Sequence, residues 1–328
     1  MTRQISIETE RFKIAGEGFA ISRGRRTHAE VLMVSISDGG VTGRGECVPY
    51  ARYNESLDSV TAQIRAVESA LAGGMSREEL QNVVAAGAAR NAIDCALWDL
   101  EAKQSGKTVA ELAGFAPLKE VTTAYTLSVD TPEKMAKAAA EAASRPLLKV
   151  KLAGQGDAER IAAVRSNAPH SRLMVDANEA WDESCFEENM AACQAADVAL
   201  IEQPLPAGKD ELLGEIDRPV VCCADESLHT RKDLPVLRKR YDAINMKLDK
   251  AGGLTELIAL ADEAKKLDFQ LFVGCMLGTS LAMAPAMLIA QAADFVDLDA
   301  PLLLAEDRDN PIRYDGSIMF PASPALWG

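Results

Sequence analysis

The chain has 328 residues, with 35 Lys and Arg against 49 Asp and Glu, and a formal net charge of −14. This length is typical of about two domains and supports a large hydrophobic core without disulfides or structural zinc. The acidic excess argues against nucleic acid as the main partner, because phosphate binding favours Lys and Arg.

The first 115 or so residues have the pattern of a small α+β unit. Alternating apolar and polar residues predict strands at Ile5–Ile14 and Glu30–Ser37, and the turn at Asp38 leads into a third strand at Val41–Cys47. Two helical stretches follow, the first at Ser56–Leu71. The second is an Ala-rich segment that begins with a capping box at Ser76 and Glu79. We expect an interruption near Gly87 and an end after Gln104, at Gly106. Strands followed by helices indicate an α+β fold.

From about Val121 onwards, short apolar runs alternate with helical segments of ten to fifteen residues. There are eight such runs: Thr122–Leu127, Leu147–Leu152, Arg172–Asp176, Val198–Glu202, Pro219–Asp225, Ala243–Leu248, Phe269–Gly274 and Phe295–Asp299. Eight repeated βα units predict a closed parallel barrel. An open doubly wound sheet is the rival, but no G-x-G-x-x-G follows any of these runs. We expect a capping domain over 1–118, completed by the tail 303–328, and a catalytic barrel over 119–302.

Chemistry in such barrels lies at the carboxyl ends of the strands. Acids end three successive runs, at Asp176, Glu202 and Asp225, and should converge on one arc. Three neighbouring carboxylates repel one another unless a cation neutralises them. All-oxygen ligation without His or Cys favours Mg²⁺, with Mn²⁺ as the alternative.

Two lysines flank these acids, Lys151 in the second run and Lys247 in the sixth, and should face each other across the barrel mouth. Such a pair could remove and return the proton α to a metal-bound carboxylate from opposite faces, through an enediolate. Asp297 and Asp299, across the mouth from the metal, offer a negative site for an ammonium group. A carboxylate at one end and an amine at the other describe a short peptide.

These residues resemble the enolase superfamily, in its muconate-lactonizing subgroup. The resemblance is carried by Lys149-Val150-Lys151, the three acids and Lys247-Leu248-Asp249, and runs nearly end to end through Gly87–Asn91 and Gly274–Leu277. With Asp297-x-Asp299 and the segment Pro49–Ser56, it is greatest to the dipeptide epimerases that act on L-Ala-D/L-Glu. It implies a modified (β/α)7β barrel with an N-terminal capping domain, and an isomerase.

The resemblance also implies roles for individual residues. It makes Asp176, Glu202 and Asp225 the magnesium ligands, Lys151 and Lys247 the two acid/base groups, and Lys149 a neutralising partner of the bound carboxylate. Asp297 and Asp299 would hold the dipeptide ammonium, and Arg26 the Glu side chain. Thr126, Cys275 and Leu277 match positions that line the substrate pocket. We expect Asn178, Glu226 and Asp249 to orient the ligands by hydrogen bonds.

Other functions stay open at this point. A cycloisomerase or o-succinylbenzoate synthase-type reaction would leave Asp297 and Asp299 without a purpose, and a non-catalytic peptide-binding barrel would leave the two lysines unexplained. Another dipeptide specificity and self-association into a homo-oligomer both remain open.

Composition and motifs also bear on location. Seven cysteines without C-x-x-C, no apolar run long enough for a bilayer, and an N-terminus lacking a signal-peptide core favour the cytoplasm, with no membrane partner. The resemblance implies a role in recycling murein peptides.

Overall fold

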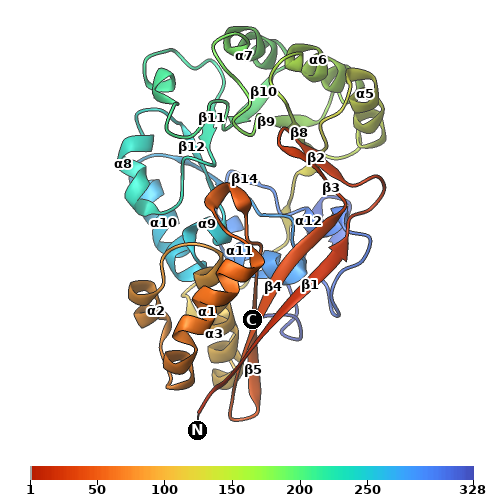
Figure 1. Cartoon of the computed structure of the whole chain (residues 1–328). Coiled ribbons are helices and arrows are strands. Elements are labelled where there is room, and N and C mark those ends of the chain that lie inside the picture. Colours follow the sequence, from red (N-terminus) through yellow and green to blue (C-terminus); the bar gives the residue numbers. More distant parts are fainter. Residues whose placement is uncertain (1) are drawn as a thin grey trace.

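The computed structural model describes residues 2–328 and consists of two parts (Figure 1). The lower part in Figure 1 is an antiparallel sheet in the order β1-β4-β5, covered by three helices. Its elements are β1 (Gln4–Lys13), β4 (His28–Asp38), β5 (Val41–Cys47), α1 (Leu57–Ala72), α2 (Arg77–Val83), α3 (Ala88–Ser105) and the short α4 (Val109–Leu112). The three predicted strands and the turn that joins the second to the third are confirmed.

The helix ends follow the predicted signals. Ser76 accepts a hydrogen bond from the Glu79 main-chain N–H, and the Glu79 side chain accepts one from the Ser76 N–H, which starts α2. The interruption near Gly87 separates α2 from α3. Gly106, with a φ of 69°, ends α3 in the left-handed region that glycine adopts without strain.

Helix α3 packs on β5 at unusually close range because two glycines face it. A Cβ built on Gly43 would overlap the main-chain oxygen of Ala96, and one on Gly45 would overlap that of Ala92. These glycines, which belong to no dinucleotide-binding motif, let helix and strand backbones approach each other.

Replacing Gly45 with Ala is therefore expected to destabilise the protein by about 1–3 kcal/mol, because the overpacked helix must shift. The change is measured as the free energy of unfolding in denaturant. Gly73→Ala is the control: Gly73 has a φ of −75° and nothing nearer than 3.4 Å to its built Cβ. An unchanged stability of Gly45→Ala would show that the close packing is unimportant.

The upper part is a barrel of eight parallel strands, arranged in sequence order (Figure 1). The strands are β7 (Tyr125–Leu127), β8 (Leu147–Lys151), β9 (Arg172–Asp176), β10 (Val198–Glu202), β11 (Cys222–Ala224), β12 (Ala243–Met246), β13 (Gln270–Val273) and β14 (Phe295–Val296). The main-chain N–H of Ala124 donates to the oxygen of Val296 at 2.8 Å, which joins the first strand to the last.

One buried cluster fills the barrel interior with a residue from each strand or its start: Ala124, Leu147, Met174, Leu200, Cys223, Ala243, Phe272 and Phe295. A layer of this kind is what a closed barrel needs. The predicted barrel is thus confirmed, and the open doubly wound sheet is wrong.

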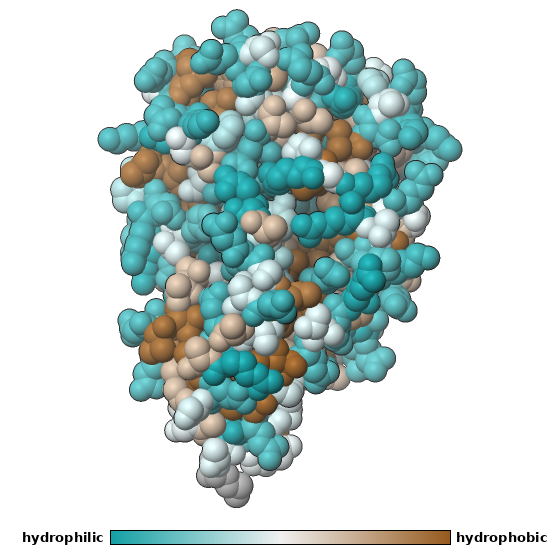
Figure 2. Space-filling view, in the orientation of Figure 1, coloured by the Kyte–Doolittle hydropathy of each residue, from teal (hydrophilic) through white to brown (hydrophobic). Residues whose placement is uncertain are grey.

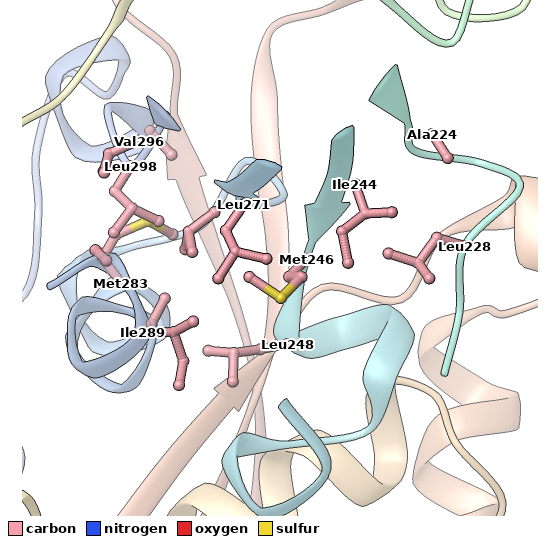
Figure 3. Packing of buried hydrophobic residues seen from close by; sticks show 14 of the residues in the cluster. Ala224, Leu228, Ile244, Met246, Leu248, Leu271, Met283, Ile289, Val296 and Leu298 are labelled. Carbon is pink, nitrogen blue, oxygen red and sulfur yellow. The ribbon is translucent and has the colours of Figure 1, made fainter. Parts of the chain in front are cut away.

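Helices cover the outside of the barrel. The longer ones are α5 (Pro132–Glu141), α6 (Asp157–Asn167), α7 (Phe186–Ala195), α10 (Leu254–Lys266) and α11 (Ser280–Ala290). The short ones are α8 (Leu234–Leu237), α9 (Leu248–Ala251), α12 (Ala300–Leu303) and the 3₁₀ turns η2 (Glu211–Gly214) and η3 (Arg231–Asp233). The 3₁₀ turn η1 (Ala51–Tyr53) lies between β5 and α1 in the lower part. Figure 3 shows apolar side chains such as Met246, Leu271 and Val296 packed towards Met283 and Ile289 of α11.

The expectation of ten- to fifteen-residue helices after every strand is wrong after β10 and β11. Only η2 follows β10, and only η3 and α8 follow β11. Pro204, Pro206 and Gly208 lie directly after β10, where proline and glycine oppose a regular helix. These loops are therefore irregular around the site.

Further contacts join the two parts. A hairpin of β2 (Phe19–Ile21) and β3 (Gly24–Arg26) reaches the barrel, and a small sheet contains β6 (Val121–Thr122), β15 (Tyr314–Asp315) and β16 (Ile318–Met319). The last residues return to α3, where Trp327 Nε1 donates to the main-chain oxygen of Cys95 at 3.0 Å. Within residues 2–328, no helix has the length and apolar character that crossing a membrane requires.

Candidate active site

The carboxyl ends of β9, β10 and β11 bring three acids together. Glu202 pairs in register with Asp176 on the neighbouring strand, and Asp225 directly follows β11. All three side chains are buried. The predicted convergence of Asp176, Glu202 and Asp225 on one arc is confirmed.

Three lysines interleave with these acids. Lys149 Nζ lies 2.7 Å from Glu202 Oε2 and 3.4 Å from Asp176 Oδ2. Lys151 Nζ lies 2.5 Å from Asp176 Oδ2, and Lys247 Nζ lies 2.6 Å from Asp225 Oδ2. Strands β9, β10 and β11 separate the strands that carry Lys151 and Lys247, so these two amines lie on opposite sides of the acids.

The charges of this cluster depend strongly on one another. Burial and the neighbouring Asp176 raise the pKa of Glu202 to about 8. Burial opposes the charged form of Lys247, yet Asp225 and Glu202 hold its pKa well above the ordinary value. Lys247 could act as a base only if further positive charge offset these carboxylates.

The donor set fits a hard divalent cation. It consists of carboxylate oxygens, the ligands that Mg²⁺ prefers. Neighbouring lysines hold the pKa of Asp176 and of Asp225 below the ordinary value, whereas burial and Asp176 raise that of Glu202. Glu202 Oε2 is buried and accepts no well-formed hydrogen bond, although Lys149 Nζ is near. Within residues 2–328, no three such side chains already have metal-site geometry, and lysine amines contact each of the three acids.

A cavity of about 230 Å³ opens above the cluster. Its lining includes Lys151, Lys247, Asp225, Arg26, Cys275 and Leu277. The β2–β3 hairpin contributes part of the wall, and Figure 2 shows strongly hydrophilic side chains over the junction between the two parts. Both lysines that flank the acids therefore face the same ligand-sized space.

Asp297 and Asp299 are buried behind this lining. Asp297 Oδ2 accepts a hydrogen bond from Lys149 Nζ at 2.7 Å, and Asp299 Oδ2 accepts one from the Thr126 main-chain N–H at 2.7 Å. Asp297 and Glu202 thus share the amine of Lys149. Asp297 therefore lies nearer to the three acids than the predicted position across the barrel mouth. Burial and the Asp297 charge raise the pKa of Asp299 to about 7.

The hairpin carries three arginines, of which Arg23 and Arg25 pair with carboxylates, Arg25 with Asp130 at 3.4 Å. Arg23 donates to Glu226 Oε1 at 2.8 Å and to the Asn178 main-chain oxygen at 3.0 Å, a role that the sequence did not indicate. Arg26 is exposed and stands over the Tyr50 ring at 5.4 Å, with no carboxylate partner among the described residues. Arg26 is therefore the arginine that remains available to a ligand.

The three residues expected to orient the ligands have different surroundings. The Asn178 main-chain N–H donates to Asp176 Oδ1 at 2.9 Å, and Glu226 is engaged by Arg23. Asp249 Oδ1 instead accepts from the Val48 N–H and from Asn91, both in the lower part. Asp249 thus joins the segment after Lys247 to the capping part.

Sequence reasoning missed further residues that support the acids. Asn245 Nδ2 donates to Glu202 Oε1 at 2.7 Å, and Gln203 Oε1 accepts from the Asp225 N–H at 2.8 Å. Lys250 Nζ lies 2.5 Å from Asp225 Oδ1. The position of Lys250, three residues after Lys247 in a buried turn, was the one available signal for this contact.

A closed barrel with a capping part and a ring of lysines and carboxylates at its mouth is an enzyme architecture, and the comparisons give its class. Residues 4–114 match the family model for the mandelate racemase / muconate lactonizing enzyme N-terminal domain, and residues 133–324 match the enolase C-terminal domain-like model. An N-acetyl-D-glutamate racemase of Pseudoalteromonas sp is 48% identical over 91% of this chain and 95% of its own. The L-Ala-D/L-Glu epimerase of Escherichia coli is 47% identical over 90% and 93%.

Solved structures agree with this class. An enolase family member from Agrobacterium tumefaciens with homology to dipeptide epimerases, with bound sodium and L-Ala-L-Glu, is 55% identical, has a TM-score of 0.98, and covers 99% of this chain and 100% of its own. A dipeptide epimerase of Methylococcus capsulatus, complexed with Mg and L-Arg-D-Lys, is 27% identical with a TM-score of 0.90, covering 100% and 99%. The protein is an isomerase of the racemase and epimerase kind. It belongs to the enolase superfamily, in the mandelate racemase / muconate lactonizing enzyme family.

Proposed function

We propose that this protein epimerises dipeptides, foremost L-Ala-L-Glu and L-Ala-D-Glu, in a magnesium-dependent reaction. The observation that carries the proposal is the placement of Lys151 and Lys247 on the wall of one cavity, on opposite sides of the acids. A single base would not require this arrangement, whereas inversion at a carbon needs a proton donor and an acceptor on opposite faces.

Asp176, Glu202 and Asp225 would hold the metal ion. When bound, Mg²⁺ would polarise the substrate carboxylate and stabilise the charge that develops on it, an effect worth several kcal/mol. A member of this superfamily is expected to pair such an ion with a Lys or His base.

The protein's own groups would carry the proton steps. One lysine removes the α-proton of the Glu residue and the other returns a proton to the opposite face, so the same pair serves both epimers with reversed roles. Lys149, between Glu202 and Asp297, would offset negative charge on the substrate carboxylate. Arg26 would bind the Glu side chain, because its fork suits a carboxylate.

The remaining end of the dipeptide carries an ammonium group. Asp297 and Asp299 would bind it, with Thr126 fixing Asp299. Cys275 and Leu277 would line the pocket. Cys275 acts there as packing, since burial raises its pKa well above the ordinary value and makes a thiolate nucleophile unfavourable.

A second candidate is the racemisation of N-acylated glutamate, which the 48%-identical relative's activity favours. N-Acetylglutamate keeps the carboxylate, the amide and the Glu side chain but has no ammonium group. It would therefore need the lysines and the metal but not Asp299.

The test is incubation of L-Ala-L-Glu and N-acetyl-L-glutamate in deuterated water with Mg²⁺, followed by mass spectrometry and NMR. We expect epimerised dipeptide with deuterium at the Glu α-carbon, and complete loss of both epimerisation and exchange after treatment with EDTA. Epimerised product without deuterium, or activity insensitive to EDTA, would contradict the proposal.

We also propose a cytoplasmic location. All seven cysteines are free thiols, as a reducing compartment favours.

A further inference from the structure

Lys250 is a buried amine of the site that the proton-transfer scheme does not use. Its Nζ donates to Asp225 Oδ1 at 2.5 Å, to the Asp225 main-chain oxygen at 2.5 Å and to the Asn245 main-chain oxygen at 3.1 Å. An ammonium group has three protons, so all its donors are engaged. Lys250 also does not line the cavity, and it therefore has neither the access nor a free proton for exchange with substrate.

The three acids share a pattern in which one oxygen is tied to the protein and the other faces an amine. Asp176 accepts from the Asn178 N–H at Oδ1 and from Lys151 at Oδ2. Glu202 accepts from Asn245 at Oε1 and has Lys149 at Oε2. For Asp225, Lys250 holds Oδ1 and Lys247 lies at Oδ2.

Asp225 differs from the other two in how it is anchored. Asp176 and Glu202 are tied by neutral N–H groups, whereas Asp225 is tied by an ammonium that also grips its main-chain oxygen. Gln203 fixes its main-chain N–H. Asp225 is thus held at three atoms, and only Oδ2 is left towards Lys247 and the cavity.

We propose that Lys250 is a positioning residue that orients Asp225 for metal binding. The inference rests on the proposed function, because it takes Asp225 as a metal ligand. Without Lys250, the Asp225 carboxylate could rotate, and the main-chain oxygens of Asp225 and Asn245 would each lose one donor, although the Leu228 N–H still donates to the Asp225 oxygen at 3.1 Å. Removing a partner that hydrogen-bonds a metal ligand commonly lowers metal affinity about 10- to 100-fold.

The test replaces Lys250 with Met, which keeps the side-chain length and removes the charge. Mn²⁺ binding is measured without substrate, from the electron paramagnetic resonance signal of the free ion. We expect the Mn²⁺ dissociation constant to rise about 10- to 100-fold, and excess Mg²⁺ to restore α-proton exchange. Because bound metal also stabilises a weakened fold, the exchange is compared at a temperature at which Lys250→Met is fully folded without metal.

The matched control is Lys103→Met, which removes a lysine 2.7 Å from the buried Asp99 on α3 and away from the site. Its metal affinity should be unchanged. If Lys250→Met does not fold, Lys250→Gln, which retains N–H donors, is measured instead and should weaken Mn²⁺ binding by a smaller factor.

The outcomes separate this inference from the proposed function. Metal affinity in Lys250→Met equal to or tighter than that of the unmodified protein, or a loss that excess Mg²⁺ does not reverse, overturns the role of Lys250 alone. If the unmodified protein binds no Mn²⁺, or Asp225→Asn leaves binding unchanged, both the metal site and the role of Lys250 are wrong.

Discussion

Lys151→Ala is expected to abolish epimerisation while leaving α-proton exchange from one of the two epimers intact. Lys151 and Lys247 approach the acids from opposite sides, so each lysine can reach only one face of the substrate carbon. With Lys151 removed, Lys247 can still take a proton from its own epimer and return one to the same face. Overall turnover should fall at least about 100-fold, the usual minimum contribution of a general acid or base.

The measurement is NMR in deuterated water, with L-Ala-L-Glu and L-Ala-D-Glu supplied separately. Lys247→Ala should show the reciprocal pattern, and exchange should be lost from the other epimer. Lys134→Ala, an exposed lysine on α5, should match the unmodified protein. Loss of exchange from both epimers in each variant would mean that the lysines do not act on separate faces.

The regular spacing of the βα units made the acids and lysines predictable. Each strand adds one carboxyl end to the same edge, so residues about one unit apart, such as Asp176 and Glu202, must become neighbours. The capping box at Ser76 and Glu79 is similarly local, because its hydrogen bonds span three residues. Patterns of this kind depend on short-range geometry and parallel order alone.

What the sequence did not reveal depends on long-range packing. The sequence alone does not distinguish Arg23, Arg25 and Arg26. The path of the hairpin over the barrel brings Arg23 to Glu226 and leaves Arg26 without a carboxylate partner among residues 2–328. Asp249 is the last residue of the motif Lys247-Leu248-Asp249, yet the short helix α9 turns it towards Val48 in the other part. Short 3₁₀ and α-helical turns likewise stand after β10 and β11, where periodicity predicted longer helices, and prolines oppose a helix directly after β10.

The ion pair between Lys149 and Asp297 was likewise not evident from the sequence. The two residues are on the strands at either side of β7, which closes the barrel, and Lys149 reaches both Asp297 and Glu202 at 2.7 Å. Among residues 2–328, no lysine pairs with Asp299, whose side chain accepts the hydrogen bond from the Thr126 N–H. Of the two aspartates, Asp299 is therefore the one whose charge, when it is ionised, forms no ion pair with a lysine of the described residues.

This difference leads to a substrate-specific prediction. Asp299→Asn should lower kcat/KM for L-Ala-L-Glu about 30-fold or more, because losing one partner of a buried charge pair costs about 2 kcal/mol or more. Asparagine can still accept the Thr126 hydrogen bond, so the local structure should persist. Activity towards N-acetyl-L-glutamate should be unchanged, since that molecule has no ammonium group.

The same residue predicts a pH dependence for the dipeptide that N-acetyl-L-glutamate should not show. Asp299 has a pKa raised to about 7 by burial and by Asp297, so it is charged above pH 7 and neutral below. The kcat/KM for the dipeptide should therefore fall as the pH drops through about 7, and Asp299→Asn should remove this step. The pH dependence of kcat/KM is measured from steady-state rates between pH 5.5 and 8.5 at one Mg²⁺ concentration. N-Acetyl-L-glutamate is the matched control substrate. An Asp299→Asn variant that loses both activities equally would place the ammonium elsewhere and make Asp299 a support of the barrel mouth.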